Sequence, residues 1–97
     1  MIVRKDLSYS SPAVQAGHVI AEFCMHHIQS RIWNNHTLIY LEVNNLDELD
    51  RWMFKFEKRN IDISFFEEPD LNYELTAICG LVDEGEEGFL SDLNLLQ

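Results

Sequence analysis

The sequence has few basic residues: its 97 residues include 7 lysines and arginines against 17 aspartates and glutamates, a formal net charge of −10 at pH 7. The average field of such a chain repels nucleic acid and anionic membrane surfaces. Any contact with RNA therefore has to be local. The same charge suits a protein partner with a basic surface, toward which electrostatic steering speeds the encounter.

Long apolar runs and cysteines are also scarce. No run approaches the ~20 apolar residues that span a bilayer, and the opening MIVRKDLSYS has no apolar core of the signal-peptide type. We therefore expect a cytoplasmic protein with no membrane partner. The two cysteines, Cys24 and Cys79, lie in apolar segments, so we expect buried, reduced thiols and no disulfide.

Glycine and proline are rare as well, with 4 and 2 residues, whereas hydrophobic residues make up 46% of the chain and aromatic residues 11%. This composition argues against disorder and is sufficient for a core at this length. Residues 1–97 are therefore interpreted as one domain, without internal repeats or low-complexity segments.

Capping residues, turn residues and apolar spacing divide the chain into strands and helices. Ser10-Ser11-Pro12 marks a helix start, and Asn60 marks the end of a second helix. The apolar end, residues 89–96, is either a helical turn or an edge strand. The expected elements are strands over 2–4, 37–43, 61–66 and 73–79 and helices over about 13–29 and 46–59.

The order β-α-β-α-β-β predicts an α/β fold. Its two strand-helix-strand units imply right-handed crossovers and a mixed, mostly parallel sheet, with an antiparallel final pair of strands. The first helix is apolar on most of its circumference and should be well covered. We expect the helices to pack on the sheet in two or three layers.

The stretch VRKDLSYSSPAVQAGHVIAEF resembles the opening of the type 2 peptidyl-tRNA hydrolases, a strand, an Asp-Leu loop and a helix bearing Ala-x-Gln-x-x-His, here Ala13, Gln15 and His18. The segments TLIYLEV, LDELDRWMFKFEKRN, FFEEPDLNYELTAICG and DLNLL follow in the family's order, so the resemblance covers nearly the whole chain. It implies that family's fold, and an esterase that cleaves peptidyl-tRNA.

Two catalytic elements of that family differ here. Its active-site lysine belongs to a Gly-Lys pair ahead of the helix, and these positions carry Ser10 and Ser11. The family's Asp-Ala-Gly-x-Thr loop after the third strand becomes Glu-Glu-Pro-Asp, residues 67–70, and Thr76 corresponds to a later threonine. The resemblance therefore implies a divergent member without the lysine.

Crowded carboxylates follow the third strand, where ligands gather in open α/β sheets. Such carboxylates raise one another's proton affinity, so one of them is suited to activate water for ester hydrolysis. We interpret Glu67, Glu68 and Thr76 as the catalytic set; an acidic turn without a function is the competing interpretation. The residues expected to bind or orient a substrate are Lys5, Ser8, Ser11, Gln15, His18 and Asp70.

A polar stripe follows the first helix, because Gln15, His18, Glu22 and His26 recur at intervals of three or four residues. A solvated face is the simplest interpretation, and contact with a substrate or partner is the alternative. The stripe extends over about 12 Å from His18 to His26, too far for one ion. We expect no metal and no cofactor.

Four of the basic residues, Arg51, Lys55, Lys58 and Arg59, lie on the second helix, opposite its apolar face. They form either a phosphate-binding stripe or a solvated face that is paired internally. The spacing of Asp47 and Arg51 favours internal pairing.

Two functions remain open. The first is hydrolysis of the ester of peptidyl- or N-acyl-aminoacyl-tRNA by an activated water, against which the missing lysine and the negative charge weigh. The second is a catalytically inactive relative that binds a protein as a small acidic inhibitor or adaptor. Trp33 and Trp52, assigned to the core or to an interface, leave a homodimer open as well.

Overall fold

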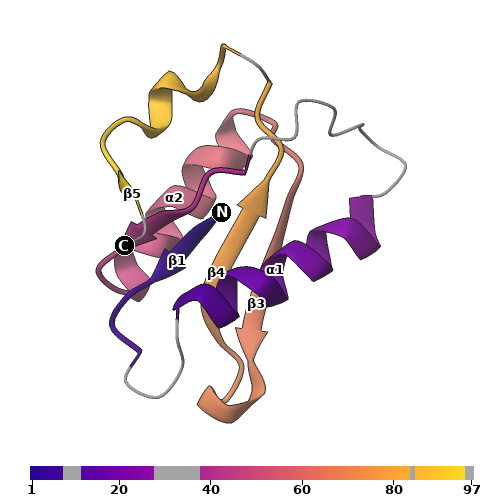
Figure 1. Cartoon of the computed structure of the whole chain (residues 1–97), viewed down its shortest axis with the longest axis vertical. Helices are drawn as coiled ribbons and strands as arrows, with labels where there is room; N and C mark the ends of the chain where they lie inside the picture. The colour runs from indigo at the N-terminus through magenta and orange to yellow at the C-terminus, as the bar shows by residue number, and fades with distance from the viewer. Residues whose placement is uncertain (8–11, 28–37, 84, 96–97) are drawn as a thin grey trace.

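The computed structural model describes residues 1–7, 12–27, 38–83 and 85–95 (Figure 1). In this part of the chain the strands are β1 (Ile2–Arg4), β2 (Leu41–Val43), β3 (Ile63–Glu68), β4 (Glu74–Gly80) and β5 (Asn94–Leu95). The helices are α1 (Pro12–His27) and α2 (Leu46–Lys58), with 3-10 turns η1 (Pro69–Leu71) and η2 (Glu87–Leu90). The predicted α/β class and order of elements are confirmed, and β5 is added to them.

The five strands form one mixed sheet in the order β3-β4-β1-β2-β5. Only β1 and β2 pair in parallel, while β4 is antiparallel to both β1 and β3, and β5 is antiparallel to β2. The predicted mostly parallel sheet is therefore wrong. The short connection through η1 folds β4 back against β3, so β4 fills the place beside β1. β1, β2 and β3 therefore run in one direction, but β4 separates β3 from β1.

Three predicted strand bounds also change. The third strand was expected over 61–66, but β3 extends to Glu68, so Glu67 and Glu68 belong to the strand and not to the following loop. β2 is shorter than expected, since residues 38–40 have no regular structure and Thr37 lies outside the described residues. β4 starts one residue later than predicted and ends at Gly80.

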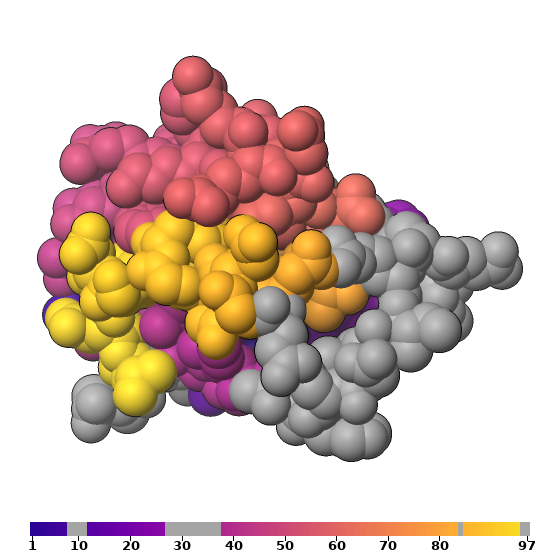
Figure 2. Space-filling model, turned by 90° about the horizontal axis from the view of Figure 1, so that it is seen from above, coloured from indigo at the N-terminus to yellow at the C-terminus, as the bar shows by residue number. Residues whose placement is uncertain are grey.

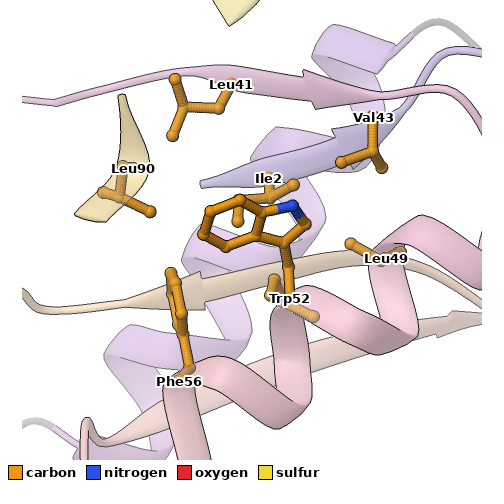
Figure 3. Packing of buried hydrophobic residues seen from close by; sticks show 8 residues of the cluster. Ile2, Leu41, Val43, Leu49, Trp52, Phe56 and Leu90 are labelled. Carbon is orange, nitrogen blue, oxygen red and sulfur yellow. The ribbon is translucent and has the colours of Figure 1, made fainter. Parts of the chain in front are cut away.

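The two helices cover opposite faces of the sheet, which gives three layers. α1 packs over a small cluster of Val3, Ala16, Val19 and Ala77. The cluster under α2 is larger and surrounds Trp52 (Figure 3). Its buried members are Ile2, Leu41, Val43, Leu49, Trp52, Phe56, Ile78 and Leu90. Ile2 and Val3 in β1, like Ile78 and Ala77 in β4, point to opposite layers, as the alternation of side chains in a strand requires.

The outer face of α1 contradicts the expectation that this helix is well covered. Val14 and Met25 are 51% and 72% exposed, and no described element packs on that side. Cys24 is exposed too, so the expected burial of its thiol is wrong. Cys79 is half-buried, and burial raises its pKa. Both cysteines are free in this structure.

The ends of α2 follow the sequence closely. The side chain of Asn45 accepts a hydrogen bond from the backbone N–H of Glu48 at 3.0 Å. The Glu48 carboxylate in turn accepts one from the backbone N–H of Asn44 at 2.8 Å, and this bond lowers the pKa of Glu48. The first bond satisfies a backbone N–H that the first helical turn leaves unpaired, and the second ties the residue before the cap to the helix. Asn60, with a left-handed φ of 57°, ends the helix as predicted.

The C-terminal segment contains both of the structures proposed for it, the helical turn η2 and the edge strand β5. Phe89 packs edge-on against Phe56 with ring centroids 5.6 Å apart, and Leu90 is buried in the α2 cluster. Figure 2 shows this yellow segment lying along α2. It therefore covers a side of the core that the sheet and α2 alone would leave open.

Alanine substitutions at Gly80 and at Gly17 should change the stability of the fold in opposite directions. A Cβ at Gly80 would lie 3.0 Å from both Ile61 Cγ2 and Phe56 Cε2, whereas one at Gly17 in α1 meets nothing within 4 Å. Gly80→Ala should lower the free energy of unfolding by about 1–3 kcal/mol through overpacking. Gly17→Ala should raise it by roughly 0.5–1 kcal/mol through helix propensity. Urea unfolding of both variants checks the two signs, and destabilisation by Gly17→Ala would contradict the exposed placement of that residue.

Candidate functional site

The carboxyl ends of β1, β2 and β3 meet at one edge of the sheet, because these strands run in the same direction. The start of β4 lies at the same edge, since β4 runs antiparallel to β1 and β3. In open α/β sheets this edge is where ligands bind. The candidate site is located here.

A β-bulge in the β3–β4 hairpin shapes the site. Phe66 pairs with Ala77 and Glu67 pairs with Leu75, so Thr76 is an extra residue without a partner in the ladder. Ala77 belongs to the α1 cluster, whereas Leu75 packs against the α2 cluster. The bulge therefore turns the hydroxyl of Thr76 toward α1, next to Ala77.

Three of the predicted site residues meet in a buried chain of hydrogen bonds. Thr76 Oγ1 donates to Gln15 Oε1 at 2.5 Å, and Gln15 Nε2 donates to Glu68 Oε2 at 3.1 Å. Gln15 and Thr76 are almost completely buried, and Glu68 is half-buried. Because the Thr76 hydroxyl bonds the amide oxygen, the amide N–H groups are turned to the carboxylate. Glu68 is thus held in a fixed position at the edge of the sheet.

The other residues of the polar stripe on α1 lie beside these hydrogen bonds. The ring of His18 stacks on Phe66, with centroids 4.5 Å apart and an angle of 8° between planes. Further along, His26 Nδ1 lies 3.3 Å from Glu22 Oε2. The interpretation of the stripe as a solvated face is therefore wrong for Gln15, which is buried, although His18 and His26 are exposed.

A buried arginine that the sequence analysis missed lies at the same edge. Arg4 is 6% exposed and donates to both carboxylate oxygens of Asp6 at 2.9 Å, to Glu74, and to the carbonyl of Leu75 at 3.0 Å. Hydrogen bonding to Asp6 raises the pKa of Arg4, and the guanidinium lowers the pKa of Asp6. Glu74 is also the cross-strand partner of Glu68. The positive charge of Arg4 is therefore neutralised by two carboxylates.

The other predicted site residues lie apart from this chain. Lys5 lines a hollow of about 300 Å³ on the α2 side. Its Nζ lies 3.9 Å from Glu42 Oε1. Glu67 lines a groove along β3, and Asp70 is exposed in η1. Ser8 and Ser11 lie outside the described residues. The geometry thus separates Glu67 from Glu68, which the sequence analysis treated as one pair.

The basic residues of α2 are exposed opposite its buried face, as predicted, but their expected internal pairing is wrong. Among the described residues none of the four lies within 4.0 Å of a carboxylate, and this includes Arg51 and Asp47. Aromatic rings take that role instead. The cation–ring pairs are Lys55 over Trp52 at 4.2 Å, Lys58 over Phe54 at 5.2 Å and Arg59 over Phe89 at 4.1 Å.

Trp52 is a core residue, as one of its two interpretations required, while Trp33 lies outside the described residues. Across the described ranges, no three histidine, cysteine or acidic side chains are grouped so as to hold a metal ion. Neither described helix is long and apolar enough to cross a membrane.

Comparison with known proteins gives no family assignment: no protein-family model matches the chain, and no curated protein matches its sequence. What the candidate site is able to do therefore has to be argued from its geometry.

Replacement of Thr76 tests the buried hydrogen bond. Thr76→Val keeps the shape of the side chain but removes the hydroxyl that donates to Gln15 Oε1 in a buried place. We expect a loss of about 1–3 kcal/mol in unfolding free energy. Thr76→Ser keeps the hydroxyl and should lose less than half of that. A loss in Thr76→Ser that equals or exceeds the loss in Thr76→Val, measured by denaturant unfolding, would contradict a dominant contribution of the hydrogen bond.

Asp6 gives the site a dependence on pH. Its folded pKa lies below the unfolded value of about 4, so ionised Asp6 stabilises the fold above that pH, and the stabilisation is lost as pH falls through the folded pKa. Since the Asp6 side chain is 37% exposed, we expect solvent to hold its contribution below about 1 kcal/mol. Asp6→Asn should lower the thermal midpoint at pH 7. It should also reduce the loss of stability that the unaltered protein shows as the pH falls below about 4. Asp62→Asn, an exposed control, should retain the wild-type acid profile.

Proposed function

We propose that this chain hydrolyses the ester of peptidyl- or N-acyl-aminoacyl-tRNA, with Glu68 as the base that activates water. The convergence of Gln15, Thr76 and Glu68 at the carboxyl ends of the strands carries the proposal. The resemblance to type 2 peptidyl-tRNA hydrolases supports the same substrate class, because Gln15 lies in the motif that carries it.

The reaction that we propose needs only one proton to move in each direction. Glu68 accepts a proton from water while the water oxygen attacks the ester carbonyl and the C–O bond to the ribose breaks. Glu68 then returns the proton to the departing ribose oxygen. Gln15 acts as a positioning residue, since its amide donates to one carboxylate oxygen, and Thr76 orients that amide. Arg4 is not assigned to the reaction, because Asp6 and Glu74 already neutralise it.

The negative net charge restricts where tRNA binds. The cations of α2 support a local phosphate contact, because rings and not carboxylates lie against Lys55, Lys58 and Arg59. Cations without acidic partners keep their attraction for phosphates. We assign tRNA contact to this stripe and the chemistry to Glu68.

The adjacent carboxylates provide a matched pair of variants. Glu68→Gln should reduce release of N-acetyl-amino acid from N-acetylated aminoacyl-tRNA, measured at enzyme excess, by about 10²–10⁴-fold. Glu67→Gln removes the same charge one residue away, outside the hydrogen-bond chain, and should change the rate less than about threefold.

Two results would contradict the proposal. Loss of cleavage in Glu67→Gln alone would assign the chemistry to the other carboxylate. No cleavage above the uncatalysed rate by the unaltered protein would remove the chain from the hydrolases.

Protein binding by a catalytically inactive chain is the second candidate, and the outer face of α1 favours it. Val14 and Met25 are exposed there beside Ala21 and Cys24, so the helix presents apolar surface that no described element covers. An exposed apolar face is typical of protein contact sites. Absence of hydrolysis together with recovery of a partner at low salt would favour this function over the first.

A further inference from the structure

We propose that the outer edge of β3 binds an extended peptide segment that carries basic side chains, as an additional strand of the sheet. β3 is the first strand of the order β3-β4-β1-β2-β5, and no described strand pairs with its outer side. Backbone N–H and C=O groups on such an edge are able to pair with a further strand. Residues 64–68 of β3 alone are long enough for several such bonds.

A groove of about 410 Å³ runs beside this edge. It lies between α1 and β3 and continues to the residue before β4. Its lining residues are Glu22, His26, Ile63, Ser64, Phe65, Phe66, Glu67 and Tyr73. Four consecutive residues of β3, from Ser64 to Glu67, thus line one groove, as expected for a surface that receives an added strand.

Ser64 provides independent support for an occupant. Its side chain is only 5% exposed, yet its hydroxyl has no hydrogen-bond partner among the described residues. Buried hydroxyls are almost always paired, and an unpaired one marks a site where something else is able to supply the partner. Because Ser64 lines the groove, a change of its χ1 rotamer would turn the hydroxyl toward an occupant.

The charges of the groove select the chemistry of that occupant. Glu22 and Glu67 lie in its lining, and the described lining residues include no lysine or arginine. Phe65 and Tyr73 are 45% and 66% exposed and offer rings to apolar or cationic side chains. An extended segment with alternating apolar and basic residues complements both the acidic lining and the exposed rings. A second copy of this chain is a poorer occupant, since each copy carries a net charge of −10.

Peptide binding at this groove does not depend on ester hydrolysis. The Gln15–Thr76–Glu68 chain contributes no residue to the groove, so either activity is able to exist without the other. Binding and cleavage are therefore measured separately, and failure of one leaves the other standing.

The first experiment uses a fluorescein-labelled peptide of alternating valine and lysine, about eight residues long, and follows its anisotropy with the full chain. We expect saturable binding that weakens with added salt, and shifts of the backbone amide signals of residues 64–68 in a ¹⁵N spectrum. A peptide with glutamate in place of lysine should not bind. A peptide with alternate backbone nitrogens methylated, which removes ladder donors, should bind about tenfold more weakly or not at all.

Two variants with equal changes in charge test the site. Glu22→Gln with Glu67→Gln should weaken the valine-lysine peptide about tenfold, whereas Asp50→Asn with Glu57→Gln on exposed positions of α2 should change it less than about twofold. Ser64→Ala should weaken binding about threefold while leaving the thermal midpoint unchanged or higher, because it removes an unpaired buried group.

Three outcomes would overturn the inference. The first is absence of saturable binding by the unaltered protein, and the second is equal weakening by the groove and α2 double variants. The third is a concentration-dependent dimer, measured by light scattering, whose contact lies at residues 64–68 and which the peptide does not dissociate; this result would assign the edge to a second copy.

Discussion

The bulge at Thr76 is the constraint on which both the core and the candidate site depend. In a regular ladder Leu75 and Ala77 would point to the same layer, but here Leu75 packs toward α2 and Ala77 toward α1. One extra residue therefore lets β4 contribute to both cores and places a hydroxyl among the residues under α1. Without it, the buried amide oxygen of Gln15 would lose the hydrogen bond that Thr76 donates.

The two layers that flank the sheet differ in character. Under α2 the cluster is large and apolar and contains aromatic rings, and the C-terminal segment closes it. Under α1 the apolar cluster is small, and a polar chain extends it to the edge of the sheet. The α2 side thus supplies most of the hydrophobic stability, which leaves the α1 side able to carry buried polar groups.

The sequence predicted local features well and long-range pairing poorly. α2 was foreseen because capping, charge and apolar spacing all act within a few residues of one another. The position of β4 between β3 and β1 depends on cross-strand pairing, which no local signal encodes, so the sequence alone predicts a mostly parallel sheet.

In the candidate site, too, the sequence identified individual residues but not the long-range contacts between them. Gln15, Glu68 and Thr76 were selected individually, but their contact depends on a bulge that sequence spacing does not reveal. Arg4 was missed because its partner Glu74 lies 70 residues away. The α2 cations were seen, but the rings beneath them, such as Phe89 under Arg59, come from distant parts of the chain.

The central place of β1 has a consequence for how the chain folds. Ile2 shares one cluster with Ile78 and Leu90, and β1 receives its neighbours from residues 41–43 and from β4. β1 precedes every described element that covers it, so almost all of them have to be synthesised before its surface is covered. A high average sequence separation between contacting residues slows folding, so this small chain should fold more slowly than a helical bundle of its size. During synthesis β1 would remain unpaired at the ribosome until β2 emerges, and the core would close only after η2.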